Sequence, residues 1–591
     1  MLVYGDRTCR VSTSAMLAGI VRRSSRVAVM PPGIQRHGVL VDAFIEAAQL
    51  LQGIADAEFE GRGCDGGSPA QDAAMGLLTA LADAIRRSWN STFAHIAPVT
   101  PDVFTPLHTT HLPESVRVSR PEGYAFYALF PEAYLEAARD LGNAAPGTPP
   151  LRVIGIRSIG TGLAALVAVA SGVRNPITVR PVGDPYKREI RLCPQRAAAI
   201  ARDAGARFAI VDEGPGLSGS SFGAVADLLE DAGIPAAHIH FFPGHMSSLG
   251  PMASVRHRQR WARASRRVVD FDALVLRAAD PAHRLENWVA DLTGAACAPF
   301  QDISGGAWRE RHFAGEASWP PSHVQQERRK FLLHGAGATW LLKFVGLGRE
   351  GARKLELARQ LHAAGFGPEP AGYRHGFLVE RWIAQATPLQ PRAADREELI
   401  ARLAAYIGFR ARAFPTTGDQ GASLRRLLQM ARRNTELGLG PAHARQLDIW
   451  EAEMPALEPR VRRILGDNRL HAWEWLRTAD GRVIKTDALD HHAAHDLIGC
   501  QDVTWDIAGA SIEFELSDAE QAHLCAGIAR IAPARVDRRL LAFSQPCYAA
   551  FQLGYWSLAA CALAGDPAEA SRTRAAADRY TKVLARLLET A

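Results

Sequence analysis

Short apolar runs alternate with helical segments between Leu151 and Phe242, and this alternation constrains the fold more than any other feature of the sequence. The predicted strands and helices, in chain order, are 151–156, 162–171, 177–180, 208–211, 222–232 and 237–242. Strands separated by helices of this length form right-handed βαβ units, which place the strands in a parallel sheet. The pattern therefore predicts a parallel-sheet α/β domain over residues 115–300.

A second pattern begins after residue 326. Two apolar runs, Phe331–Leu333 and Thr339–Phe344, enclose a glycine-rich turn and predict a β-hairpin. A helix over 350–364 and a strand over 376–382 follow, and the remainder reads as helical except for 470–487. We therefore expect four parts, namely a helical extension (1–114), the α/β domain (115–300), a linker (301–326) and an α+β domain (327–591).

The composition excludes several classes of protein. With 591 residues, 47% of them hydrophobic, and a mean hydropathy of −0.08, the chain is neither disordered nor membrane-embedded, and its length requires several domains. The net charge of +6 is dispersed, so nucleic acid is not an expected partner. Eight cysteines without a CxxC pair, no signal-peptide pattern, and a longest apolar run of only Gly162–Val173 favour a cytoplasmic protein without a membrane partner.

Lysine is rare in this chain. Only six of the 68 basic residues are lysines, and they are Lys187, Lys330, Lys343, Lys354, Lys485 and Lys582. A lysine ammonium is a compact point charge, whereas an arginine guanidinium is a planar fork. Because arginine is the default cation here, each lysine becomes a candidate for a specific role.

The segment 208–222 combines a strand, two acids, a glycine-rich loop and the start of a helix. Backbone N–H groups of Gly216–Ser221 at a helix N-terminus can cradle a phosphate, helped by the serine hydroxyls of the loop. Asp212 and Glu213 follow the strand at the edge where open α/β sheets bind ligands, and carboxylates there can accept hydrogen bonds from sugar hydroxyls. The pattern predicts a ligand that joins a phosphate to a ribose diol.

This segment resembles the signature of the type I phosphoribosyltransferases. The resemblance implies that the turn after the first strand binds pyrophosphate, that 182–188 is a mobile loop over the reaction, and that Asp212 and Glu213 act in catalysis. The implied reaction is displacement of pyrophosphate from phosphoribosyl pyrophosphate by a nitrogen nucleophile, with Mg²⁺ bound to the diphosphate and sugar oxygens. The residues implied to bind this substrate are Arg157, Ser158, Lys187, Arg188, Asp212, Glu213, Gly216, Ser218, Gly219, Ser220 and Ser221.

A second group of candidate residues lies in the α+β domain. Lys343 ends a predicted strand, and Glu356 lies on the next predicted helix. Further along, Gly466–His471 precedes Glu474, and the predicted strand 481–487 ends in Asp487. Lys485 lies two residues before Asp487, so the two side chains point to the same face of that strand.

This order resembles the aminoglycoside phosphotransferase and choline kinase branch of the kinase-like fold. The resemblance implies an ATP site in which Lys343, oriented by Glu356 or less favourably by Glu350, binds phosphate. It also implies that the strand carrying Glu380 contacts adenine and that Lys485 contacts phosphate. Glu474 and Asp487 would bind Mg²⁺, and Asp467 would be the catalytic base.

The sequence departs from that branch at the catalytic loop. The family has an asparagine five residues after its catalytic aspartate, whereas here Glu474 holds the asparagine's place and Asp467 lies two residues too early. A carboxylate can replace an amide as a ligand of a hard cation. The histidines of 490–496 repeat no zinc spacing and are interpreted as hydrogen-bonding groups, while Asp502 and Asp506 are expected to cap a helix and anchor the loop.

Two hypotheses about function follow. The first is a bifunctional transferase that carries out phosphoribosyl transfer to a nitrogenous acceptor and ATP-dependent phosphoryl transfer to a small molecule. The alternative is a nucleotide-binding regulatory or interaction protein in which one or both halves are inactive. Two departures allow it, namely Gly214–Pro215, where the phosphoribosyltransferases usually have apolar residues, and the catalytic loop with Asp467 and Glu474. Small-molecule substrates are the expected partners, and the acceptors, a homo-oligomer and the role of residues 1–114 stay open.

Overall fold

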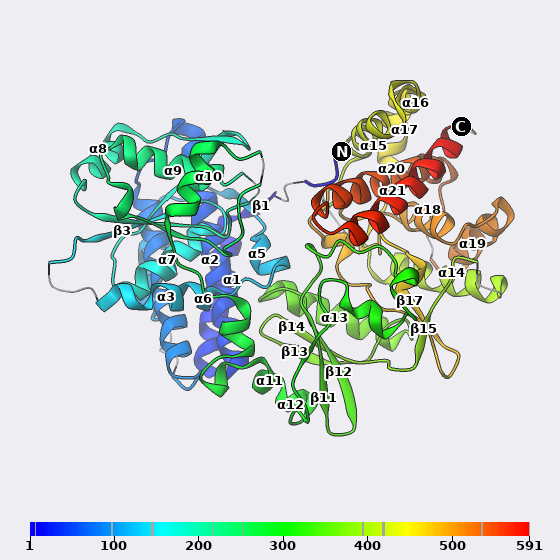
Figure 1. The fold of residues 1–591 in the computed structure, drawn as a ribbon, viewed down its shortest axis with the longest axis horizontal. Coiled ribbons are helices and arrows are strands. Elements are labelled where there is room, and N and C mark those ends of the chain that lie inside the picture. Colours follow the sequence, from blue (N-terminus) through cyan, green and yellow to red (C-terminus); the bar gives the residue numbers. More distant parts are fainter. Residues whose placement is uncertain are drawn as a thin grey trace.

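The computed structural model describes residues 1–5, 8–95, 99–143, 147–216, 218–250, 252–392, 395–416, 420–532 and 536–589. Two halves lie side by side, one drawn in blue to green and the other in green to red (Figure 1). The first half is built on a parallel sheet, and the second combines an antiparallel sheet with a large group of helices. The sheets and helices of the two halves therefore agree with the expected α/β domain followed by an α+β domain.

A five-stranded parallel sheet organises the first half. Its strands lie in the order β4 (Ile177–Val179), β3 (Leu151–Ile156), β7 (Arg207–Val211), β8 (Ile239–Phe242) and β9 (Ser265–Arg266). Every neighbouring pair is parallel, as the sequence predicts. Helices α7 (Gly160–Ala170) and α9 (Ser220–Asp231) follow β3 and β7. The strand order reverses between β3 and β7, and the carboxyl ends of these strands are where such sheets bind ligands.

Alternate side chains of β7 enter two different cores. Ala209 and Val211 pack with α7 and the N-terminal helices, whereas Phe208 and Ile210 pack with α9. This separation follows from the two-residue period of a strand. A sheet covered on both faces explains why its strands read as continuous apolar runs in the sequence.

Three long helices lie within residues 1–114. They are α1 (Thr13–Val29), α2 (Ile34–Arg62) and α3 (Pro69–Asn90), and the hydroxyls of Ser12 and Ser68 cap α1 and α3. Helices α2 and α3 pack against α7, while α1 packs against α2. Strand β1 (Thr8–Ser12) pairs with β2 (Ser115–Ser119). Helix α2 is long and apolar enough to cross a membrane, but 78% of its most apolar window is buried inside the protein. These helices therefore share one hydrophobic core with the parallel sheet.

The first half contains further short elements around this sheet. They are α4 (Thr105–Thr109), α5 (Glu122–Phe126), α6 (Pro131–Ala138), β5 (Pro181–Asp184), β6 (Lys187–Ile190), α8 (Pro194–Arg202), α10 (Val255–Arg263), α11 (Leu285–Trp288) and α12 (Ala290–Thr293). Strands β5 and β6 form an antiparallel hairpin. The segment predicted as a mobile loop, 182–188, is thus the tip and both arms of this hairpin.

The antiparallel sheet of the second half has the order β10 (Gln301–Asp302), β11 (Lys330–Gly335), β12 (Ala338–Phe344), β14 (Phe377–Arg381) and β13 (Pro370–Arg374). The β11–β12 pair confirms the predicted hairpin, and α13 (Arg349–Ala363) follows it. Phe331, Phe344 and Phe377 lie in the core of the first half, whereas Leu378 packs with the helices of the second half. The sheet therefore joins the two cores.

The rest of the second half is mainly helical. Its elements are β15 (Ala386–Pro388), α14 (Arg396–Ala413), α15 (Leu424–Leu439), α16 (Pro441–Gln446), α17 (Met454–Leu457), β16 (Arg463–Ile464), β17 (Trp475–Thr478), β18 (Val483–Lys485), β19 (Gln501–Asp502), α18 (Val503–Glu513), α19 (Asp518–Ile531), α20 (Arg538–Ala562) and α21 (Pro567–Glu589). Ser517 and Glu520 form a capping box at the start of α19. Strands β17 and β18 account for the predicted interruption at 470–487.

Two segments tie the halves together. The N-terminus lies beside α15 in Figure 1, where the backbone N–H of Leu2 donates to Asn434 Oδ1 over 2.6 Å and Val3 is buried. In the predicted linker, Arg309 is buried and its guanidinium bonds the Glu569 carboxylate over 2.5 Å. The linker residues are therefore packed against α21.

Candidate functional sites

The first candidate site lies at the carboxyl end of β7, where Asp212 and Glu213 follow the strand directly. Glu213 Oε2 accepts a 2.7 Å hydrogen bond from the backbone N–H of Gly123 on α5, and Tyr134 donates to the Asp212 carbonyl over 2.8 Å. Among the described residues neither carboxylate has an ion-pair partner within 4.0 Å. Burial raises the pKa of Asp212 to about 7, and burial together with the Asp212 charge raises the pKa of Glu213 to about 8.

Two close contacts set the shape of this edge. A Cβ on Gly160 would lie 2.6 Å from the Val211 carbonyl oxygen, so a glycine is required where α7 starts beside β7. Gly219 has a left-handed φ of 58° and immediately precedes α9. The loop 214–221 therefore leads into the N-terminus of a helix, as predicted. Ser220 and Ser221 lie in the first turn of that helix. Leu217 lies outside the described residues.

The hydroxyls of the loop contact the β5–β6 hairpin. Ser218 and Ser220 both donate to the carbonyl oxygen of Pro185, over 2.9 and 2.6 Å. At the hairpin itself Lys187 is exposed and Arg188 donates to the Gly183 carbonyl over 2.6 Å. The segment 182–188 thus lies over the loop, as a closing segment must, but its contacts occupy the serines that were predicted to bind phosphate.

Arg157 has partners other than the predicted pyrophosphate. It is buried at the end of β3, with its guanidinium 3.2 Å from Asp56 and ion-paired with Asp65. Arg180 bonds the same Asp56 carboxylate, so these groups form a network between α2 and the sheet. Ser158 is half-buried in the turn that follows. The arginine's position is explained by this network, and a pyrophosphate role for it remains a prediction.

The second candidate site is a pocket of about 210 Å³ where both halves meet. Tyr4, Phe126 and Tyr127 line it from the first half and the N-terminus. The second half contributes several charged side chains, namely Lys330, Lys343, Arg469, Glu474, Asp487, Asp490, His491 and Asp496. The predicted phosphate lysine and both predicted magnesium ligands therefore border one cavity.

Lys343 is fixed by two carboxylates. Its buried ammonium on β12 lies 2.5 Å from Asp487 Oδ1 and 2.9 Å from Asp490 Oδ2. The predicted pair between Lys343 and Glu356 is wrong, because Glu356 is exposed on α13 and bonds Gln360. The alternative partner, Glu350, lies 3.4 Å from Arg120.

Lys354 is the residue of α13 that reaches this cluster. Its ammonium lies 2.5 Å from Asp490 Oδ1 and donates to the Val345 carbonyl over 2.7 Å. The sequence contained a signal for it, because Lys354 shares an i, i+3, i+7 stripe with the buried Leu357 and Leu361, whereas Glu356 does not. The helix therefore supplies a cation where the resemblance implies an anion.

Asp467 does not have the free carboxylate that a catalytic base needs. It is 1% exposed, accepts a hydrogen bond from Tyr406, and lies 3.4 Å from Lys485 and 3.2 Å from His491. Burial favours the neutral form, but the Lys485 charge and the His491 hydrogen bond outweigh it and hold the pKa of Asp467 well below its usual range. A carboxylate so stabilised is a poor proton acceptor.

Other members of the predicted set also occupy defined places. Lys485 is fully buried and donates to Glu474 and to the Asp487 carbonyl, both over 2.8 Å. Glu380 is buried on β14, where burial raises its pKa to about 7 against the opposing effect of Lys343. Asp506 accepts hydrogen bonds from the backbone N–H groups of 467 and 468, which confirms its predicted anchoring role.

Arg469 is a pocket residue that the sequence did not single out, whereas His491 was expected to form hydrogen bonds and does so with Asp467. Arg469 lies five residues before Glu474, the spacing at which the kinase-like branch has its catalytic aspartate, and its guanidinium stacks on Tyr555 at 4.3 Å and reaches Asp496 over 3.3 Å. Burial lowers the pKa of His491, but hydrogen bonds to Asp467 and Asp487 raise it to about 9. Both residues are therefore cationic at neutral pH.

The chemistry of the donor set fits a hard cation. Asp487 and Glu474 both line the pocket, and carboxylate oxygens are the ligands that Mg²⁺ prefers. The Asp487 side chain is 35% exposed, so it is accessible to a ligand in the pocket. These two residues remain the ones that would hold the ion.

Helix α5 connects the two candidate sites. Its Gly123 N–H bonds Glu213 of the first site, while Phe126 lines the pocket of the second. Glu122 lies 3.0 Å from His495 Nε2, and Tyr127, which follows α5, bonds His495 Nδ1 over 2.8 Å. One short helix therefore contacts both candidate sites.

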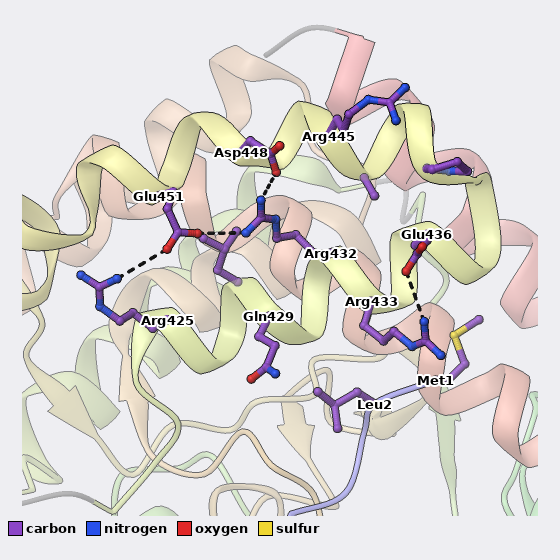
Figure 2. A pocket seen from close by; sticks show the side chains of 13 residues that line it. Met1, Leu2, Arg425, Gln429, Arg432, Arg433, Glu436, Arg445, Asp448 and Glu451 are labelled. Carbon is purple, nitrogen blue, oxygen red and sulfur yellow. Dashed lines mark hydrogen bonds and ion pairs between the residues drawn. The ribbon is translucent and has the colours of Figure 1, made fainter.

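A larger hollow of about 820 Å³ lies elsewhere, between α15 and α16. Figure 2 shows that its arginines point at acids of the same wall, with Arg432 directed at Asp448 and Glu451, and Arg433 at Glu436. None of the predicted site residues lines it. Because Arg425, Arg432 and Arg433 are already paired and exposed, this hollow is a surface groove that is not part of either candidate site.

No protein-family model and no curated protein sequence matches the chain. Solved structures of small-molecule kinases are similar to part of it. A choline kinase from Streptococcus pneumoniae is 15% identical over 44% of this chain and 89% of its own, with a TM-score of 0.32. A spectinomycin phosphotransferase solved with ADP and spectinomycin is 11% identical over 52% and 95%, with a TM-score of 0.34. An ethanolamine kinase from Plasmodium vivax is 11% identical over 62% and 94%, with a TM-score of 0.32. These likenesses are distant, and the pocket is interpreted from its own contacts.

Proposed function

We propose that the second half binds a nucleoside triphosphate with Mg²⁺ in the 210 Å³ pocket and transfers a phosphoryl group to a small-molecule acceptor. The observation that carries this proposal is Lys343, a buried ammonium 2.5 Å from the Asp487 carboxylate at the wall of the pocket. An ammonium and a carboxylate in one cavity offer a point charge for phosphate beside oxygen ligands for a cation.

The charges around the pocket indicate how such a transfer would proceed. Phosphoryl transfer depends mainly on positioning and on neutralising charge, and Mg²⁺ bound by Asp487 and Glu474 would neutralise phosphate oxygens. Lys343 and His491 add two further cations from the chain itself. Asp467 is not assigned as the base, because its hydrogen bonds and the Lys485 charge stabilise the carboxylate and lower its affinity for a proton. The proton of the acceptor would then pass to solvent or to a phosphate oxygen.

The rival hypothesis is that the second half binds a nucleotide without turning it over. Arg469 favours this hypothesis, because it stands where the kinase-like branch has its catalytic aspartate. Calorimetry with ATP and Mg²⁺, followed by a phosphotransfer assay on a panel of amino alcohols and aminoglycosides, separates the two. Binding with transfer supports the proposal, binding without transfer supports the regulatory alternative, and no binding overturns both. Lys343→Met should abolish binding and Lys343→Arg should weaken it, whereas Lys582→Met, which changes an exposed lysine of α21, should not.

A second proposal concerns the first half, which we infer binds phosphoribosyl pyrophosphate and transfers its ribosyl group to a nitrogenous acceptor. The observation in its favour is the pair Asp212 and Glu213, which lack an ion-pair partner among the described residues, with Asp212 beside Gly160 at the start of α7. Carboxylates in that state can accept ribose hydroxyls and a cation that arrives with the diphosphate.

The test is binding of phosphoribosyl pyrophosphate to the full chain. Asp212→Asn with Glu213→Gln should lose it, while Asp231→Asn, an exposed acid at the end of α9, should retain it. Release of pyrophosphate with a panel of nucleobases would establish turnover. Unchanged binding in the double variant would overturn this second proposal without affecting the first.

A further inference from the structure

A cluster of three buried ligand-type side chains lies between the halves, away from both candidate sites. His37 comes from α2, Glu132 from α6, and His375 from the turn between β13 and β14. One ligand atom of each lies within 4.8 Å of the other two. Glu132 Oε1 is 2.6 Å from His37 Nε2 and 3.3 Å from His375 Nε2. Three elements from distant parts of the chain thus converge on one carboxylate.

The charge of Glu132 lacks the usual compensation. Its side chain is fully buried, and among the described residues no lysine or arginine forms an ion pair with it. Its second oxygen, Oε2, has no hydrogen-bond partner, and neither has His375 Nε2. Buried carboxylates are normally paired or coordinate metals, and unsatisfied buried polar atoms are rare.

The surroundings orient these side chains toward a common point. Ser88 Oγ bonds His37 Nδ1 over 2.8 Å, which directs the opposite nitrogen, Nε2, at Glu132. Metal-bound histidines are held in this way through the nitrogen that does not bind the ion. Aromatic rings enclose the group, with Phe93 5.0 Å from the His37 ring and Phe130 5.3 Å from the His375 ring. The enclosure excludes competing water.

The backbone at His375 is held in an unusual conformation. Its φ is 37°, in the left-handed region that residues other than glycine rarely adopt. Glycines in this two-residue turn would avoid the strain. Because the chain has a histidine there instead, the imidazole is held at some conformational cost. That cost is understandable if the side chain has a ligand.

We propose that His37, Glu132 and His375 bind a divalent transition-metal ion, with Zn²⁺ as the first candidate. Two imidazole nitrogens and a carboxylate are a recognised ligand set for this ion, and a Glu132 carboxylate that binds through both oxygens would raise the donor atoms to four. The ion would fasten α2 and α6 to the β13–β14 turn. Its role is structural, because it sets the position of the antiparallel sheet against the first half.

The experiment measures metal in the full chain, purified without a histidine tag or chelator from zinc-supplemented medium. Elemental analysis should find stoichiometric transition metal, and dialysis against a chelator should lower the Tm, with recovery when Zn²⁺ is returned. Glu132→Gln and His375→Gln should lose the metal. His334→Gln, which changes a histidine on β11 of the same sheet, should retain it. Ser88→Ala should weaken metal affinity about 10–100-fold.

Two results would overturn the proposal. One is wild-type protein that holds no stoichiometric transition metal, even after unfolding and refolding with Zn²⁺. The other is metal that stays bound in both ligand variants, which would place the ion elsewhere. If a variant fails to fold, X-ray absorption on the wild-type protein still decides, because two imidazoles and a carboxylate must surround the ion. This proposal is independent of both proposed activities.

Discussion

Two groups of buried and half-buried carboxylates in this protein differ in how their charge is offset. At the end of β7, Asp212 and Glu213 have no ion-pair partner among the described residues, and burial raises their pKa values to about 7 and about 8. In and beside the pocket of the second half, Asp487, Asp490 and Asp467 lie against lysines and His491, which hold all three pKa values below the usual range against the effect of burial.

The difference indicates two strategies for binding phosphate-containing ligands. A carboxylate pair that is buried without cations is costly, and it becomes favourable when a proton, a hydroxyl donor or a metal ion arrives with the ligand. A cluster that already contains its cations is stable when empty and rigid, so its ligand meets a preformed arrangement of charges. Substitutions should therefore affect the first site mainly through ligand binding and the second mainly through folding.

The largest expected effect is on stability, from the same change made in both sites. Asp467→Asn leaves Lys485, Arg410 and His491 without their shared anion and should destabilise the fold by about 3–5 kcal/mol. Asp212→Asn removes an uncompensated charge and should leave the stability unchanged or raise it. Urea unfolding at pH 7.5, followed by tryptophan fluorescence and circular dichroism, compares them. Equal losses would show that the two sites do not differ in charge compensation.

An effect of comparable size should appear in the pH dependence of stability. Asp212 and Glu213 bind protons more tightly in the folded chain than in the unfolded chain, where carboxyl pKa values lie near 4. Their contribution is therefore fully favourable below about pH 4 and is lost as the pH rises through about 7 and about 8. As the pH rises over this range, the Tm of the wild type should fall relative to the Tm of the Asp212→Asn/Glu213→Gln variant. A difference that is constant with pH would contradict the raised pKa values.

Gly123→Ala tests whether the two sites communicate. The added Cβ would lie 2.4 Å from Glu213 Oε2 and 2.8 Å from Leu129 Cδ2, so the carboxylate must leave the Gly123 N–H. Loss of one such hydrogen bond is worth about 1 kcal/mol, or about fivefold in affinity. We expect this change in binding of phosphoribosyl pyrophosphate, with a smaller change in ATP affinity through α5. Gly76→Ala, on an open face of α3, is the control.

The sequence predicted the strands of the first half and the order of strand, acids and helix at the end of β7, because these depend on local pattern, whereas the ligand of the first site stays a prediction. The strand at 207–211, the acids after it and the helix start at 220 follow one another in the chain, so their proximity needs no tertiary information. The ion pairs of the second site join Lys343 to residues 144 and 147 positions away, and no periodicity encodes such partners. The His37, Glu132 and His375 cluster is invisible in the sequence for the same reason.

The smallest expected effect is that of a substitution at Glu356, on the exposed face of α13. It tests whether the charges around Lys343 are already in place before a ligand binds. If α13 supplied an acid to Lys343, Glu356→Gln would reduce ATP affinity. Because Glu356 is exposed and bonds only Gln360 among the described residues, the substitution should change stability by less than about 0.5 kcal/mol and leave ATP binding unchanged. Lys354→Met is the matched change on the buried face, and it should cost several times more, because it removes a 2.5 Å partner of Asp490. Loss of ATP binding in Glu356→Gln would mean that the helix turns to present its acid when nucleotide binds, so the cluster would not be preformed.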